Sequence, residues 1–514
     1  MNYRHIIILP ALCLGASAIS VLSGCGHAAK ESPDDDHLVI LHTNDTHSTI
    51  EPDRHNLGGI ARRKVLVDSV RGEHRNVLLV DAGDAVQGSL YYTLFGGEVE
   101  RKMMNALGYD YQILGNHEFD KGIDQLAKEW SQLNAVRLST NYDFTGTPLE
   151  PLFVPSALRR VGDHTVGFIG INLDPEGIVI KDNYKGVRYQ DAIERANAEA
   201  ARLREAGATT VVAITHIGYE NGNDYSDLAL AKASKDIDVI IGGHSHTRID
   251  PQAGEPAWRV ANAEGDTITV LQTGSQGQEL GEVDIDLATG KVKARLIPVD
   301  SRLDSRVSCE FEQMIAPYKH TVDSVRGIVV GTSPRLFERK SPEMVNLLSD
   351  FVRERGSEIA GKKADLAIMN KGGIRNSLDA GDVTRGELID IAPFDNSIVV
   401  LDILGKDLID NFEIMAAQGG NGVSGNVRVL YDPETHKVNS ATIDGKPIDP
   451  RRLYRLATID YLAAGNDYME PLKKGNEIAR SPNVLYLELI DRFASGKMDH
   501  LTAKPDTTER MAAF

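Results

Sequence analysis

The sequence predicts a chain of the α/β class, built from two domains. Short apolar runs recur along its first half, and each is followed within a few positions by Asp, Asn, Gly or His. Short continuous apolar runs are typical of strands buried on both faces by helices. The chain has 514 residues; at roughly 100–200 residues per domain, two or three domains can each bury a core.

The composition excludes some partners. Hydrophobic residues make up 41% of the chain and charged residues 25%, as in ordinary globular proteins. The formal net charge is −18, and no basic stripe offsets it, which argues against a nucleic-acid polymer as partner. Small anionic substrates stay possible, because local arginines and metal ions decide their binding.

The N-terminal segment predicts export. Arg4 precedes a mostly apolar stretch at 6–22 that has the length of a signal peptide. It ends in Leu-Ser-Gly-Cys, which resembles a bacterial lipobox, so residues 1–24 would be removed and Cys25 would carry lipid. An uncleaved transmembrane anchor is the alternative. We therefore expect an exported lipoprotein of the cell envelope, on its periplasmic face or outer surface.

The stretch that follows is predicted to be a tether. Residues 25–37 are polar and include three consecutive aspartates, as solvated linkers often do. Beyond Cys25 the mature chain has only Cys309, so no internal disulfide is possible. Cys309 is expected to be a buried or partly buried thiol.

The first strand is expected at Leu38–Leu41, and it runs directly into a polar turn with Asp45 and His47. These two residues lie two apart, so an extended backbone places both side chains on one face. A carboxylate and an imidazole at a strand end can form half of a metal site. Solvated turn residues are the alternative for such a pair.

Two further strand–helix units repeat this arrangement. A strand at 77–80 leads to Asp84, a helix is expected at 98–107, and a strand at 111–114 leads to Asn116. Ligands in α/β sheets bind at the carboxyl ends of the strands. Three such ends with polar residues therefore favour a binding site over solvated turns.

Two later strands add histidines. Residues 210–214 lead to His216, and residues 237–241 lead to His244 and His246, again a pair two apart. Carboxylate, amide and imidazole donors together are typical of sites for Zn²⁺, Mn²⁺ or Fe.

The remaining elements follow from periodicity and capping. Helices are expected at 191–206 and 305–326, and antiparallel strands within 268–287. In the second half we expect a helix at 341–354 capped by Ser341, and a strand at 364–368.

Five segments, HTNDTH, DAGD, GNHEFD, TH at 215–216 and GGHSH, resemble the calcineurin-like metallophosphatase superfamily. More narrowly, they resemble the bacterial 5′-nucleotidase and UDP-sugar hydrolase family. The resemblance implies a four-layer αββα sandwich at 38–304, a linker helix at 305–327 and a smaller α/β nucleotide-binding domain at 328–514. It also implies two divalent metal ions (Zn, Mn or Co), one held by Asp45, His47, Asp84 and His246 and the other by Asp84, Asn116, His216 and His244. The family often has Gln at position 246, so the metal preference could differ here.

The same resemblance assigns the reacting groups. His117 would face the phosphate, stabilising the transition state or protonating the leaving oxygen, and Asp120 would hold its imidazole in the useful tautomer. A structural His–Asp contact is the alternative. Two cations a few ångström apart offset the charge of a phosphate ester and acidify a water for in-line attack.

The second domain resembles the nucleotide-binding half of that family. NKGGIR at 370–375, PFDN at 393–396 and the segment 460–467 are similar to NGGGIR, PFGN and NFLANGGDG. The sequence GNDY at 465–468 departs from the usual GGDG and therefore alters the turn at the expected ribose contact. The implied roles are a base clamp for Phe394 and Tyr461, ribose contact for Asp467, ribose or base contact for Asn370, and phosphate contact for Arg375 and, from a looser match, Arg339. Core packing is the alternative for the two aromatic residues.

These observations and the resemblance predict a hydrolase that converts nucleoside 5′-monophosphates to nucleoside and phosphate. The resemblance also implies that the substrate bridges both domains, so that a hinge near 325–335 would carry it to the metals. The alternative is a phosphodiesterase or pyrophosphatase acting on 2′,3′-cyclic nucleotides or UDP-sugars. A non-catalytic surface-binding lipoprotein is a minor alternative, since all seven ligand positions hold competent residues. A monomer is expected, with a dimer as the alternative.

Overall fold

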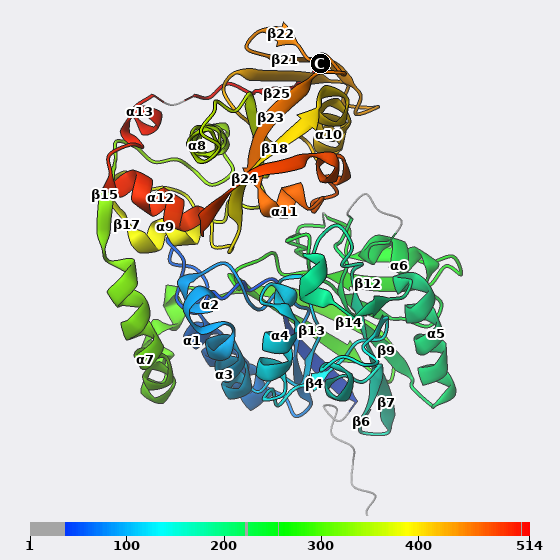
Figure 1. Ribbon diagram of the computed structural model, residues 1–514. Coiled ribbons are helices and arrows are strands. Elements are labelled where there is room, and N and C mark those ends of the chain that lie inside the picture. The colour runs from blue at the N-terminus through cyan, green and yellow to red at the C-terminus, as the bar shows by residue number, and fades with distance from the viewer. Residues whose placement is uncertain (1–35, 221–224, 255, 505) are drawn as a thin grey trace, which may run out of the picture.

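The computed structural model describes residues 36–220, 225–254, 256–504 and 506–514. The expected signal segment, Cys25 and most of the tether lie outside the described residues. The chain forms two domains that lie one above the other, with the first domain blue to green and the second yellow to red (Figure 1). Among the described helices, none is both long and apolar enough to span a bilayer.

The first sheet begins the first domain. Its strand order is β14 (Lys291–Pro298), β13 (Glu279–Asp286), β1 (His37–Thr43), β2 (Val77–Asp81), β3 (Tyr111–Gln112) and β4 (Val136–Arg137). Strands β1 to β4 are parallel, while β13 runs antiparallel to β1. The parallel strands therefore end at the same edge of the sheet.

The second sheet has the order β11 (Arg259–Ala261), β12 (Thr267–Leu271), β10 (Val239–Ile241), β9 (Thr210–His216), β7 (His164–Asn172) and β6 (Ser156–Val161). The four central strands are parallel. Antiparallel strands were expected within 268–287, and both strands there have an antiparallel neighbour: β12 pairs antiparallel with β11 and β13 with β1. Strand β12 also pairs parallel with β10 in the second sheet, whereas β13 crosses to the first sheet. The polar turn between them lets the chain change sheets.

The two sheets pack face to face and helices cover their outer faces, which confirms the αββα sandwich. On β1, Leu38 and Ile40 face the core between the sheets, while Val39 and Leu41 pack beneath helices. This is why the apolar run is continuous rather than alternating. The covering helices are α1 (Ile60–Glu73), α2 (Leu90–Phe95), α3 (Glu98–Leu107) and α4 (Gly122–Trp130) on the first sheet, and α5 (Ala192–Glu205) and α6 (Asp227–Ala233) on the second.

Helix α7 (Cys309–Arg326) runs along the side of the first domain and leads through β15 (Val329–Ser333) into the second (Figure 1). Cys309 is exposed at its first turn, so the expectation of a buried thiol was wrong. The helical period placed Phe311, Ile315 and Val322 on the buried face, and Cys309 lies off that face.

The second domain is a mixed α/β unit. Its main sheet has the order β19 (Gly422–Val423), β16 (Leu366–Met369), β23 (Leu453–Ile459), β18 (Ser397–Leu404) and β24 (Asn476–Val484). Helix α8 (Pro342–Ile359) packs on it, and Ser341 caps that helix by accepting a hydrogen bond from Met344 N, as expected. The other elements are β17 (Gly381–Thr384), α9 (Arg385–Ile391), α10 (Gly405–Ala417), β20 (Val427–Tyr431), β21 (Val438–Ile443), β22 (Lys446–Pro447), α11 (Asp460–Ala463), α12 (Leu485–Ala494), α13 (Asp499–Thr502) and β25 (Met511–Ala513).

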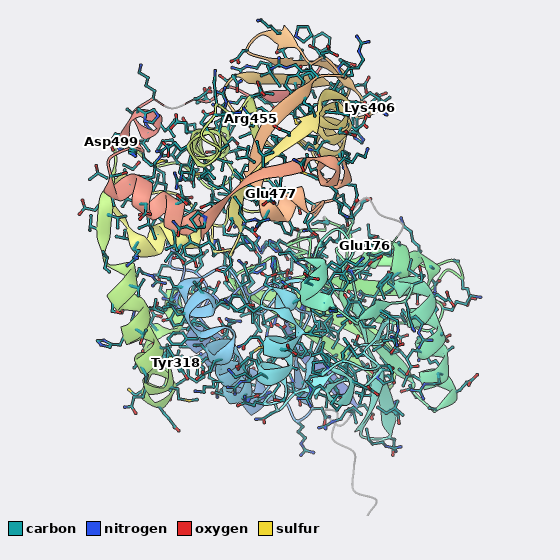
Figure 2. All side chains as sticks on the ribbon, viewed as in Figure 1. Glu176, Tyr318, Lys406, Arg455, Glu477 and Asp499 are labelled. Atoms are coloured by element: carbon teal, nitrogen blue, oxygen red, sulfur yellow. The ribbon has the colours of Figure 1, made fainter. Side chains whose placement is uncertain are left out.

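Side chains of both domains meet in the layer between them, below Glu477 and level with Glu176 (Figure 2). Polar contacts cross this layer. Lys121 Nζ lies 3.4 Å from Asp395, and Tyr461 Oη donates a hydrogen bond of 2.8 Å to the carbonyl of Ile178. The two domains therefore close over a shared cleft that faces the carboxyl ends of the first domain's strands.

Candidate metal centre and adjoining cavity

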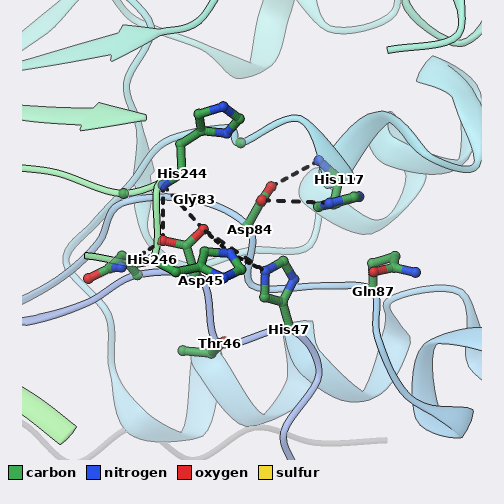
Figure 3. A network of polar contacts seen from close by, with 12 residues as sticks. Asp45, Thr46, His47, Gly83, Asp84, Gln87, His117, His244 and His246 are labelled. Carbon is green, nitrogen blue, oxygen red and sulfur yellow. Dashed lines mark hydrogen bonds and ion pairs between the residues drawn. The ribbon is translucent and has the colours of Figure 1, made fainter. Parts of the chain in front are cut away.

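The seven residues expected to bind metal lie in one connected group at the carboxyl ends of β1, β2, β3, β9 and β10. Figure 3 shows five of them, Asp45, His47, Asp84, His244 and His246. Five of them have a positive φ, between 46° and 80°, which non-glycine residues rarely adopt. Such strain persists where the surrounding structure fixes it, and it gathers at functional sites. The five are Asp45, His47, Asp84, His244 and His246.

The first subgroup is formed by Asp45, His47 and His246. The Nε2 atoms of the two histidines lie 3.0 Å apart, and His246 Nε2 lies 3.3 Å from Asp45 Oδ1. Imidazole nitrogens and a carboxylate oxygen that face one point in this way suit a divalent cation.

The second subgroup is formed by Asp84, Asn116, His216 and His244. His216 Nδ1 donates to the carbonyl of Ala82 at 2.7 Å, which directs Nε2 toward Asp84 Oδ2 at 3.3 Å. That Nε2 is buried and has no hydrogen-bond partner among the described residues. His244 Nδ1 lies 3.0 Å from Asn116 Oδ1. An orphaned ring nitrogen whose other nitrogen is fixed by a carbonyl is the usual state of a metal ligand.

The electrostatics of the group favour a cation. Burial opposes the charged form of His216, but Asp84 and Asp45 raise its pKa to about 10. By contrast, burial, with His216 adding to the effect, lowers the pKa of His244 to about 4. The buried carboxylates therefore stabilise positive charge in the site, while the imidazole of His244 is neutral. The residues fit divalent metal ions.

Residues around the group hold the carboxylates. Asn44 Nδ2 donates to Asp45 Oδ2 at 2.6 Å and to the carbonyl of Gly274, while its Oδ1 accepts from Thr273. His244 N also donates to Asp45 Oδ2 at 3.0 Å. Asn44 thus orients Asp45 rather than serving as an ordinary turn amide.

Glu118, which the sequence interpretation did not single out, fixes the position of Asp84. Its Oε2 accepts from Asp84 N at 3.0 Å and from Gly115 N at 2.6 Å, and its Oε1 accepts from Ala85 N at 2.9 Å. Gly115 has no room for a side chain, because a Cβ would lie 2.2 Å from Asp84 Oδ1. The acid inside GNHEFD was the available signal.

His117 lies between Asp120 and the second domain. Its Nδ1 is 2.9 Å from Asp120 Oδ2, and the Arg375 guanidinium donates to its Nε2 at 2.9 Å. These two contacts favour the tautomer with hydrogen on Nδ1. Burial lowers the pKa of His117, but Asp120 and Asp84 outweigh this and raise it above its ordinary value.

A cavity of about 230 Å³ extends from His117 into the cleft between the domains. Its walls include the polar residues Asn116 and His244, Ile178 and Ile180 of the first domain, and Phe394 and Tyr461 of the second. The isoleucine segment was not expected from the sequence. Also in the lining are Asp120, Asn370, Arg375 and Asp467.

The expected substrate residues are not all in this cavity. Asp467 accepts from Asn370 Nδ2 at 2.5 Å and from Tyr461 Oη at 3.1 Å, so these three side chains form one network. Arg339 instead lines a second, polar cavity of about 420 Å³ that adjoins His47. Arg375 lines both cavities. Arg339 therefore shares a cavity with Arg375 but not with Asn370, Phe394, Tyr461 or Asp467.

Comparison with known proteins agrees with this architecture. The family model for calcineurin-like phosphoesterases matches residues 38–248, and that for the 5′-nucleotidase C-terminal domain matches residues 329–474. The chain is 28% identical over 517 residues to a 5′-nucleotidase of Vibrio parahaemolyticus, covering 91% of this chain and 90% of that one. It is 31% identical over 490 residues to the trifunctional nucleotide phosphoesterase YfkN of Bacillus subtilis, covering 84% of this chain but about a third (32%) of YfkN.

A solved structure also resembles it. The crystal structure of a 5′-nucleotidase precursor from Thermus thermophilus superposes with a TM-score of 0.81 at 28% identity, covering 93% of this chain and 99% of that one. The fold and the site thus define a metallophosphoesterase, a phosphoric monoester hydrolase. With its second domain, the chain belongs to the 5′-nucleotidase family.

Proposed function

We propose that the protein is an exported, metal-dependent hydrolase that converts nucleoside 5′-monophosphates to nucleoside and phosphate. The observation that carries this is the single cavity in which His117 and two of the proposed ligands, Asn116 and His244, meet Phe394 and Tyr461 of the second domain. Export and a lipid on Cys25 remain predictions from the sequence.

The proposed ligands form two sets that share Asp84. Asp45, His47, Asp84 and His246 would hold one ion, and Asp84, Asn116, His216 and His244 would hold the other. When bound, two divalent cations would offset phosphate charge and acidify a water for in-line attack.

The protein's own groups set the proton transfers. Arg375 donates to His117 Nε2, so this nitrogen can serve a substrate only after the guanidinium has turned toward the phosphate. Asp120 then stabilises the charged imidazole through Nδ1 at 2.9 Å. His117 would stabilise the transition state or protonate the leaving oxygen.

A second candidate is cleavage of phosphate diesters or of nucleotide sugars. The polar cavity beside His47 favours it, because a second substituent on the phosphate would have space of about 420 Å³ next to the ligands. The name of the Bacillus relative, a trifunctional nucleotide phosphoesterase, is consistent with more than one ester type.

The test of these candidates is a substrate panel. We expect release of phosphate from AMP to be the fastest reaction among AMP, a 2′,3′-cyclic nucleotide and a UDP-sugar, each measured with Mn²⁺, Zn²⁺ or Co²⁺. Faster cleavage of the cyclic nucleotide or the UDP-sugar would favour the second candidate. No turnover of any of the three with any metal would contradict both.

The nucleoside clamp makes a separate prediction. Tyr461→Ala is expected to raise KM for AMP about 10-fold, because stacking a base on an aromatic ring is worth about 1–3 kcal/mol. KM for a small aryl phosphate, which has no base, is expected to change little. Tyr461→Phe is the matched control, since it keeps the ring and removes only the hydroxyl with its bonds to Ile178 and Asp467. Equal effects of the alanine variant on both substrates would show that Tyr461 is a core residue.

A further inference from the structure

A cavity about the size of one water molecule lies beneath the turn that carries Asp45 and His47. It has a volume of about 10 Å³. Its walls include Thr46 and Ser48 of the turn, Arg63 of α1 and Glu100 of α3. The cavity therefore joins two helices to the turn from which the first metal ligands project.

Three of these side chains have polar atoms that lack a hydrogen-bond partner among the described residues. They are Ser48 Oγ, Arg63 Nε and both carboxylate oxygens of Glu100. The three side chains are only 2%, 2% and 3% exposed. An unpaired buried polar group costs about 1–3 kcal/mol, and more when it is charged. Three of them around one small cavity indicate a ligand that both donates and accepts hydrogen bonds.

We propose that this cavity binds one water molecule that joins Ser48, Arg63 and Glu100, and that Glu100 is thereby a positioning residue for the metal-binding turn. A cavity of this size holds a single water when two to four polar groups line it. The inference rests on the proposed metal site.

The turn needs such support because its backbone is strained. Asp45, His47 and Ser48 have φ values of 49°, 46° and 53°, at a cost on the order of 1–3 kcal/mol each. From one side, His47 N and Ser48 N donate to the carbonyls of Asp84 and Ala85, each at 3.0 Å. From the other side, Glu100 and the water would hold Ser48.

Glu100 can fill this role in either charge state. Burial raises the pKa of the Glu100 carboxyl group to about 7, and the negative charge of Glu129 adds to this rise. The nearby Ser48 hydroxyl acts to lower the pKa. Both the carboxylate and the protonated acid can accept a hydrogen bond from the hydroxyl or from water.

The test measures Mn²⁺ binding to the full chain by calorimetry. Glu100→Leu is expected to weaken Mn²⁺ binding by about 10–100-fold, the usual effect of removing a group that orients a ligand. Glu100→Gln, which can still form a hydrogen bond to the water, is expected to bind Mn²⁺ with an affinity close to that of the wild type. If Glu100→Leu does not fold, Ser48→Ala takes its place and is expected to weaken Mn²⁺ binding. Glu98→Gln is the control on the same helix, because Glu98 pairs with Lys102 on the surface.

Each outcome decides the question. A crystal structure of the wild type with a water bonded to Ser48 and Glu100, together with restored binding in Glu100→Gln, supports the proposal. A cavity without water in that crystal structure would overturn the proposal. Unchanged Mn²⁺ affinity in both Glu100→Leu and Ser48→Ala would also overturn it, even if the Tm of these variants were lower than that of the wild type. If the wild type itself binds no Mn²⁺, the proposed metal site is wrong; if it does and the variants match it, only this inference fails.

Discussion

Replacing His117 by alanine is expected to lower kcat for AMP by about 10²–10⁴-fold, the usual contribution of a general acid–base group. The imidazole lines the cavity between the proposed ligands and Arg375, and no other described histidine there is held by a carboxylate on one nitrogen and a guanidinium on the other. Bound Mn²⁺ per chain is expected to stay at the wild-type value, since His117 is not among the proposed ligands. Steady-state kinetics measures the loss of kcat, and metal analysis of the same sample measures the bound Mn²⁺ per chain.

Two further variants serve as comparisons for His117→Ala. Asp120→Asn keeps the imidazole but removes the charge beside Nδ1, so its kcat is expected to lie between those of wild type and His117→Ala. His164→Ala removes a histidine at the start of β7, the opposite end of the sheet from the site, and is expected to leave kcat unchanged. Full turnover by His117→Ala would contradict the role of His117 as a general acid–base group. Loss of bound metal in this variant would show that His117 is itself a metal ligand.

Much of the first domain could be predicted because its signals are local. The apolar runs ending at Leu41 and Val80 mark strands that are covered on both faces, and parallel strands place their ends together. Glycines precede and follow α3, which is why its bounds at 98–107 were predicted correctly. The grouping of Asp45 with Asp84 needed only the rule that parallel strands end at one edge of a sheet, whereas His216 ends β9 of the second sheet and joins them because the two sheets pack face to face.

Other parts could not be predicted, because they depend on contacts between distant segments. Glu118 stands inside the GNHEFD segment, but its role of accepting the backbone N–H groups of Asp84 and Ala85 could not be predicted, because a backbone donor leaves no trace in the sequence. The loop at Ile178–Ile180 enters the cavity only because the second domain closes over it. Arg339 was placed from a loose match, and its bond from N to Ser377 Oγ at 2.7 Å fixes its backbone beside the other cavity.

Asp84→Asn is expected to have the largest effect of any single substitution. Asp84 Oδ2 lies 3.3 Å from His216 Nε2 and 4.0 Å from His117 Nε2, and its carboxylate lies close to ring nitrogens of His216 and His244 on one side and of His47 and His117 on the other. An amide offers one oxygen and no charge, so both proposed ions would be held less tightly. Because metal ions supply several kcal/mol of transition-state stabilisation, kcat/KM should fall by about 10³-fold or more.

Asp81→Asn is the matched control for this variant. Asp81 is equally buried, three residues earlier at the end of β2, but accepts from Thr43 Oγ1 at 2.6 Å and belongs to none of the ligand groups. Burial raises its pKa to about 7, so an uncharged amide is a mild change there. Metal analysis and kinetics should therefore separate the two aspartates. Two tightly bound Mn²⁺ ions and normal turnover in Asp84→Asn would contradict a bridging carboxylate, while equal losses in both variants would show that the strand end, rather than Asp84 itself, had been disturbed.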